Sequence, residues 1–149
     1  MLQFQGNGGG PAPLTVVGDR PRVLIAEDDL GIAFAVREFL CDHGFAVDCV
    51  IGVAESARML HRFQYSLLLT DLHLSAQRRA EGLWILSQGR EHQPAMRSIL
   101  LTAFPTPQIE YDARRLGAVE VLVKPVRLPD LLAVIRALQQ PSCRMERLE

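Results

Sequence analysis

The chain has 149 residues, of which 48% are hydrophobic and 22% charged, and its formal net charge is −1. These values predict one globular domain with a substantial core; they exclude a disordered chain and give no reason to expect binding to nucleic acid or to a membrane surface. No apolar stretch has the length of a membrane span. The three cysteines are scattered without metal-ligand spacing, which is typical of reduced thiols in a cytoplasmic protein.

Glycine and proline are frequent in residues 1–20, which show no hydrophobic periodicity, so we expect a flexible N-terminal tail there. A single domain is expected over residues 21–140, and residues 141–149 are expected to form a C-terminal tail. Short apolar runs predict five strands, at about 22–26, 46–50, 66–71, 98–102 and 119–123. Segments with helical apolar spacing predict five helices, at about 30–43, 52–62, 82–93, 107–116 and 128–139.

The run that ends at Asp71 is nearly continuous in apolar residues, which predicts a strand buried on both faces at the centre of a parallel sheet. The regular alternation of strands and helices predicts right-handed crossovers and an α/β fold whose sheet is covered by helices on both faces. In such a fold, ligands and catalytic groups gather at the carboxyl ends of the strands.

Four of the predicted strands end on polar residues that a buried strand does not require: Glu27 with Asp28, Asp71, Thr102 and Lys124. Because these ends share one edge of a parallel sheet, we expect the five side chains to converge. Three neighbouring carboxylates repel one another unless a cation lies among them, and an all-oxygen cluster with room for water suits Mg²⁺. A hard metal, a carboxylate nucleophile, a hydroxyl and an ammonium together suit transfer of a phosphoryl group to Asp71.

These residues resemble the receiver domain of two-component response regulators, the CheY-like family, over about residues 22–139. The motifs that carry the resemblance are residues 23–29, 68–74, 100–103 and 123–125, in the order and at the strands of the family. The resemblance implies a flavodoxin-like, doubly wound sheet of five parallel strands in the order 2-1-3-4-5, with five helices.

The resemblance also implies a signalling phosphoacceptor that catalyses only its own phosphorylation and dephosphorylation. A histidine kinase or a phosphotransfer protein would donate the phosphoryl group to Asp71. Mg²⁺ would be held by Asp28, Asp71 and the backbone carbonyl of His73, and Glu27 would reach it directly or through water.

In the same resemblance, Thr102 and Lys124 contact the phosphoryl group, and the Lys124–Pro125 peptide bond is cis. Hydrolysis of the phosphoryl group needs a water molecule in line with the bond to be broken. The residues two positions beyond Asp71 and Thr102, which are His73 and Phe104, are expected to flank that approach. A phenylalanine cannot orient a water molecule, so Phe104 is expected to slow the loss of the phosphoryl group.

The sequence departs from the family at three places. Ser75 stands where the family usually has proline after the phosphorylated aspartate. The stretch of residues 71–82 is about three residues longer than usual and carries Arg78 and Arg79. Val121 replaces the usual switch aromatic, three residues before the lysine.

Three other functions are compatible with parts of this pattern. A flavodoxin-like FMN binder is disfavoured because residues 27–29 are acidic and would repel phosphate without a metal. A haloacid-dehalogenase-like phosphatase needs a second aspartate two residues after its nucleophile, and here that residue is His73. The remaining alternative is a phosphorylation-independent receiver that acts as a docking module. Output is expected through the face of the fourth helix, fifth strand and fifth helix, a candidate homodimer surface with Tyr111, Arg114, Arg115 and Arg127.

Overall fold

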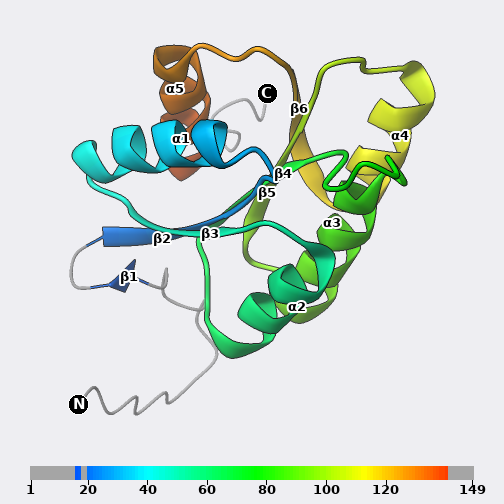
Figure 1. The fold of residues 1–149 in the computed structure, drawn as a ribbon. Coiled ribbons are helices and arrows are strands. Elements are labelled where there is room, and N and C mark those ends of the chain that lie inside the picture. The colour runs from blue at the N-terminus through cyan, green and yellow to red at the C-terminus, as the bar shows by residue number, and fades with distance from the viewer. Residues whose placement is uncertain (1–15, 18–19, 141–149) are drawn as a thin grey trace, which may run out of the picture.

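The computed structural model describes residues 16–17 and 20–140, which form one sheet with helices on both sides (Figure 1). Its strands are β1 (Val16–Val17), β2 (Arg20–Ala26), β3 (Ala46–Val50), β4 (Leu67–Asp71), β5 (Arg97–Thr102) and β6 (Ala118–Val123). Its helices are α1 (Leu30–Asp42), α2 (Val53–Arg62), α3 (Glu81–His92), α4 (Pro107–Arg115) and α5 (Leu128–Gln139). Residues 1–15, 18–19 and 141–149 of the predicted tails lie outside the described residues.

The five parallel strands lie in the order β3-β2-β4-β5-β6. Counted along the chain, this is the order 2-1-3-4-5, so the predicted doubly wound fold is confirmed. β4 lies at the centre, between β2 and β5, and its residues 67–70 are all buried. The run that ends at Asp71 is apolar along its length because both faces of this central strand are covered, as predicted.

A sixth strand, β1, was not predicted and corrects the expectation of a tail over residues 1–20. Val16 pairs with Pro21 and Val17 with Arg20 in antiparallel register. The parallel neighbours of β2 begin their pairing further along, at Arg22 and beyond, so the first two residues of β2 have backbone groups left for β1. A two-residue strand carries too little periodicity to be recognised in a glycine-rich segment.

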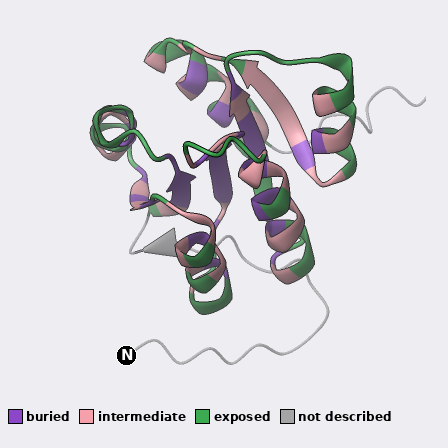
Figure 2. Cartoon of the chain, turned by 45° about the vertical axis from the view of Figure 1, so that its right-hand side comes forward, coloured by how far each residue is buried: buried purple, intermediate pink, exposed green. Residues whose placement is uncertain are grey.

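The buried residues form two clusters, one on each side of the sheet. Figure 2 shows buried positions on the central strands and on the helices that cover them. Alternate residues of β2 serve the two clusters: Leu24 packs toward α2, α3 and α4, whereas Val23 and Ile25 pack toward α1 and α5. This alternation is the period of two that a pleated strand imposes. Both faces of the sheet are therefore used for packing, which leaves its carboxyl edge for a site.

The loops at this edge are shaped by local capping. The Asp29 carboxylate accepts a hydrogen bond from the Ile32 N–H, at 3.1 Å, and begins α1; the Thr106 hydroxyl accepts one from the Ile109 N–H, also at 3.1 Å, and begins α4. Pro107 occupies the first turn of α4, as predicted.

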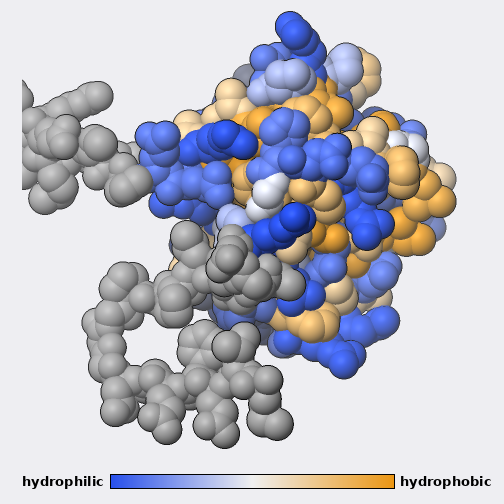
Figure 3. Space-filling view, turned by 90° about the vertical axis from the view of Figure 1, so that its left-hand side faces the viewer, coloured by the Kyte–Doolittle hydropathy of each residue, from blue (hydrophilic) through white to orange (hydrophobic). Residues whose placement is uncertain are grey.

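Among the helices of residues 20–140, none combines the length and the apolar character that crossing a bilayer requires. On the face shown in Figure 3, hydrophilic and hydrophobic residues are interspersed. Several large apolar side chains are exposed, and three of them, Leu30, Ile32 and Phe34, lie on α1.

Candidate functional site

Backbone hydrogen bonds between neighbouring strands position the predicted polar residues at the carboxyl ends of the strands. The ladder continues past the strands: the Glu27 N–H donates to the Val50 carbonyl at 3.0 Å, and the Lys124 N–H donates to the Thr102 carbonyl at 2.9 Å. Asp71 is paired in register with Leu101. These backbone contacts bring side chains from the ends of β2, β4, β5 and β6 to one edge.

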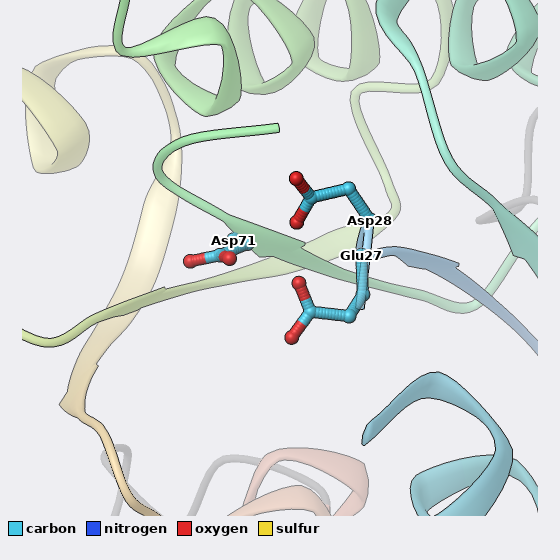
Figure 4. A group of neighbouring side chains, drawn as sticks. All are labelled: Glu27, Asp28 and Asp71. Atoms are coloured by element: carbon cyan, nitrogen blue, oxygen red, sulfur yellow. The ribbon is translucent and has the colours of Figure 1, made fainter. Parts of the chain in front are cut away.

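Three carboxylates meet at this edge. Glu27 and Asp28 follow β2, and Asp71 is the last residue of β4; one oxygen from each lies within 4.8 Å of the other two. Figure 4 shows the side chains of Glu27 and Asp28 extending from the end of β2 toward Asp71. Glu27 is buried, Asp71 is partly buried and Asp28 is exposed, so the cluster runs from the protein interior to the solvent.

Lys124 is shared by two of these carboxylates. Its Nζ donates to Glu27 Oε1 at 2.9 Å and to Asp71 Oδ2 at 3.2 Å. The other Asp71 oxygen, Oδ1, accepts a hydrogen bond from the Leu72 N–H at 2.9 Å. Glu27 Oε2 is buried and has no hydrogen-bond partner among the described residues. One ammonium therefore balances only part of the negative charge, and one buried oxygen is left for another ligand.

The electrostatics of the cluster appear in the pKa values of its members. The pKa of Glu27 is raised to about 7; burial is the largest cause, the neighbouring Asp71 side chain adds to it, and Lys124 acts in the opposite direction. Burial lowers the pKa of Lys124, but its contacts with Glu27 and Asp71 outweigh burial and the pKa is raised overall. Both pKa values are raised for the same reason: two carboxylates share one ammonium, which favours the protonated form of Glu27 and the protonated form of Lys124.

The donor set fits a hard divalent cation. Every side-chain ligand atom in the cluster is a carboxylate oxygen, and the orphaned Glu27 Oε2 is a buried acceptor that a cation or its water can satisfy. Mg²⁺ binds through one or two carboxylates and keeps several waters, which the exposed side of the cluster at Asp28 allows. His73 lines the same cleft, as required for its carbonyl to take part.

The carboxylates open into a cleft of about 310 Å³. All five predicted polar residues line it, together with His73 and Phe104. Thr102 is buried, and its Oγ1 accepts a hydrogen bond from the Phe104 N–H at 3.3 Å, so its own hydroxyl hydrogen can be donated into the cleft. Phe104 is 76% exposed at the mouth.

Two further predicted positions are seen directly. The Lys124–Pro125 peptide bond is cis. Val121 does not line the cleft; it is half-buried in β6 and packs against the core cluster beneath α2, α3 and α4. A small aliphatic residue at this position supplies no ring that could turn between the surface and the site.

The structure adds two residues to the site that were not predicted to belong to it. A Cβ atom on Gly82 would lie 2.1 Å from the Asp71 carbonyl oxygen, so α3 begins in direct contact with the backbone of Asp71 and only glycine fits there. Arg78 also lines the cleft. The sequence shows the length of the 71–82 stretch and its two arginines, but it does not show which arginine lines the cleft.

The sequence matches the response regulator receiver domain family over residues 23–136. It is 33% identical over 132 residues to the alginate biosynthesis transcriptional regulatory protein AlgB of Pseudomonas aeruginosa, covering 86% of this chain and 28% of that protein. It is 31% identical over 121 residues to the transcriptional regulatory protein TctD of Salmonella typhimurium, covering 81% of this chain and 53% of that protein. The chain thus spans about a quarter to a half of the length of these relatives.

Solved structures show the same fold. A CheY-like response regulator receiver domain protein from Methanospirillum hungatei matches with a TM-score of 0.75 at 25% identity, covering 80% of this chain and 93% of that one. A Burkholderia pseudomallei response regulator, described with a phosphorylated aspartic acid, a calcium ion and citrate, matches with a TM-score of 0.70 at 22% identity, covering 81% and 75%. With the strand order and the clustered strand-end residues, these matches establish that the chain belongs to the response regulator receiver domain family of two-component signalling.

Proposed function

We propose that Asp71 is the phosphoacceptor of this receiver domain and that its phosphorylation requires Mg²⁺. Asp28, Asp71 and the His73 backbone carbonyl would hold the ion, and Glu27 would reach it directly or through water. The observation that carries the proposal is the shared Lys124, whose Nζ contacts both Glu27 and Asp71 while a second Glu27 oxygen is buried without a partner. Two other carboxylates and an ammonium thus lie around Asp71, which lines the cleft. When bound, Mg²⁺ would neutralise charge on the transferring phosphoryl oxygens.

Each residue of the site has a separate role in the proposed phosphoryl transfer. An oxygen of the Asp71 carboxylate forms a bond to phosphorus, and the bond from phosphorus to the donor's leaving group breaks, with the electron pair leaving on that group. The Leu72 N–H holds Oδ1 and thereby fixes the plane of the carboxylate. Lys124 is already 3.2 Å from Oδ2 and balances charge as the phosphoryl group arrives. The Thr102 hydroxyl donates to a phosphoryl oxygen.

The donor would be a histidine kinase or a phosphotransfer protein, in keeping with the family, and the cytoplasm is the compartment in which this exchange takes place. For the output surface we propose the face of α4, β6 and α5, where Tyr111 and Val123 are exposed. Arg114 on this face pairs with Glu110 at 3.5 Å, and Arg127 pairs with Asp130 at 4.0 Å. Light scattering with and without beryllofluoride tests whether the face forms a homodimer; a monomer in both states would contradict it.

Labelling with acetyl phosphate tests the phosphoacceptor. Intact-mass measurement should show one phosphoryl adduct on the wild type, lost on addition of EDTA and absent from Asp71→Asn. Asp42→Asn, which removes an exposed carboxylate at the far end of α1, is the matched control and should label normally. An adduct that persists in Asp71→Asn would refute the assignment. A wild type that takes no label would instead favour the phosphorylation-independent docking module.

A further inference from the structure

Two cationic side chains line the cleft among the described residues, and they differ in what they contact. Lys124 is engaged by Glu27 and Asp71. Arg78 is exposed, and within residues 20–140 its guanidinium makes no hydrogen bond or ion pair. The cleft therefore contains one guanidinium whose five N–H donors are all available to a ligand.

The loop that carries Arg78 is held in place by Glu81, the first residue of α3. The Glu81 carboxylate accepts hydrogen bonds from the Leu74 N–H at 3.3 Å, the Arg79 N–H at 3.1 Å and the Ser75 hydroxyl. Burial alone would raise the pKa of Glu81, but these hydrogen bonds outweigh it and lower the pKa. Both ends of the loop are thus tied to one ionised carboxylate, so the segment between Ser75 and Arg79 is constrained.

Within this constrained segment the backbone turns at Arg78 itself. The Arg78 N–H donates to the Ser75 carbonyl at 3.1 Å, and the Ala80 N–H donates to His73 Nδ1 at 3.1 Å. Arg78 and Ala80 both have positive φ, at 49° and 56°, a region that costs L-residues about 1 kcal/mol or more each. Such conformations persist where the surrounding contacts impose them, and they are concentrated at functional sites.

We infer that Arg78 is a phosphodonor-binding residue, whose guanidinium contacts the non-bridging oxygens of the dianionic donor before and during transfer to Asp71. The inference rests on the proposed phosphorylation of Asp71. A dianion that enters this cleft meets Asp28 and Asp29 as well as the buried carboxylates, and Lys124 is already occupied. A planar guanidinium at the mouth binds two phosphoryl oxygens at once and offsets this repulsion. The transfer itself is unchanged: the bond from Asp71 to phosphorus forms and the leaving group departs with its electron pair.

The rate of labelling by acetyl phosphate at fixed Mg²⁺ tests the inference. We expect the second-order rate constant of Arg78→Ala to fall about tenfold, the effect of losing about 1.4 kcal/mol of donor binding. Arg78→Lys retains the charge without the planar fork and should recover part of the rate. Arg79→Ala is the matched control, because Arg79 precedes Glu81 in the same loop but does not line the cleft; its rate should stay within about twofold of wild type. Rising salt should slow the wild type more than Arg78→Ala.

The rise in melting temperature on adding Mg²⁺ separates donor binding from a structural effect. Removing a cation near the carboxylates should leave Mg²⁺ stabilisation of Arg78→Ala intact or enlarge it, whereas a collapsed loop would weaken it. Equal labelling rates in Arg78→Ala and wild type, an equal fall in Arg79→Ala, or loss of Mg²⁺ stabilisation in Arg78→Ala would each overturn the inference while leaving the proposed function standing. Absence of label on the wild type would overturn the proposed function, and this inference with it.

Discussion

Replacing Asp28 by asparagine should stabilise the metal-free protein. Asp28 contributes one of the three clustered carboxylates, and it makes no contact with Lys124, which donates to Glu27 and Asp71. Its charge therefore adds repulsion to the folded state without a compensating ion pair. Asparagine retains the size of the side chain and removes the charge.

The size of the effect follows from the separation and the exposure of these groups. At the 4.8 Å limit of the cluster, two like charges in water repel by about 0.9 kcal/mol. Asp28 is exposed, so the water value applies in full to its pair with Asp71 and by about half to its pair with Glu27, whose pKa is about 7; at pH 7 the two pairs together amount to about 1.3 kcal/mol. Salt and the more distant Lys124 reduce this to about 1 kcal/mol. For a domain of this size the melting temperature should rise by about 3–5 °C.

Asp71→Asn is expected to give a smaller rise, because it also removes the attraction to Lys124 Nζ at 3.2 Å. Differential scanning calorimetry of wild type, Asp28→Asn and Asp71→Asn, each with EDTA and then with excess Mg²⁺, measures both effects. Glu38→Gln removes one exposed charge from the middle of α1 and serves as the control for a general change in net charge.

Mg²⁺ should raise the melting temperature of the wild type and of Glu38→Gln, and it should have little effect on the two aspartate variants. If Asp28→Asn melts at the wild-type temperature in EDTA and is still stabilised by Mg²⁺, the three carboxylates do not act as one site. A rise in Glu38→Gln equal to that in Asp28→Asn would also refute the reasoning, since it would reflect net charge alone.

Gly82→Ala should destabilise the fold by about 3 kcal/mol in urea unfolding, because the new Cβ would lie 2.1 Å from the Asp71 carbonyl oxygen. Gly52→Ala is the control, because a Cβ at Gly52 meets no atom within 4 Å; it should cost well under half as much, and equal costs would contradict the contact at Gly82. Phe104→Asn should speed phosphate release from the labelled protein about tenfold, since an amide can orient the water that a phenyl ring excludes, and an equal or slower rate would show that the ring does not shield the site. Gln93→Leu should cost about 3 kcal/mol, because the buried amide satisfies three backbone groups at the end of α2 and before β4; a loss below about 1 kcal/mol would mean that these groups find other partners.

The local sequence determined the elements of the sheet and the identity of the strand-end residues. A strand buried on both faces must be apolar along its length, so the carboxylate of Asp71 stands out at the end of β4, where burial ends. Lys124 follows the mostly apolar run of β6. Alternation of such runs with helical periodicity leaves few topologies, and the observed order is one that right-handed crossovers produce. Fold, family and the five polar residues of the cleft were therefore predictable.

Tertiary structure alone decided how those residues share charge and what surrounds them. The contacts of Lys124 with Glu27 and Asp71 join residues 97 and 53 positions apart, and no periodicity records which oxygen each contact uses or that Glu27 Oε2 is left without a partner. The direction of Arg78 depends on hydrogen bonds to Glu81 and on a backbone turn in a loop without a repeating pattern. Repeating patterns report which face a residue occupies, whereas distances of a few ångströms between segments depend on how the whole chain packs.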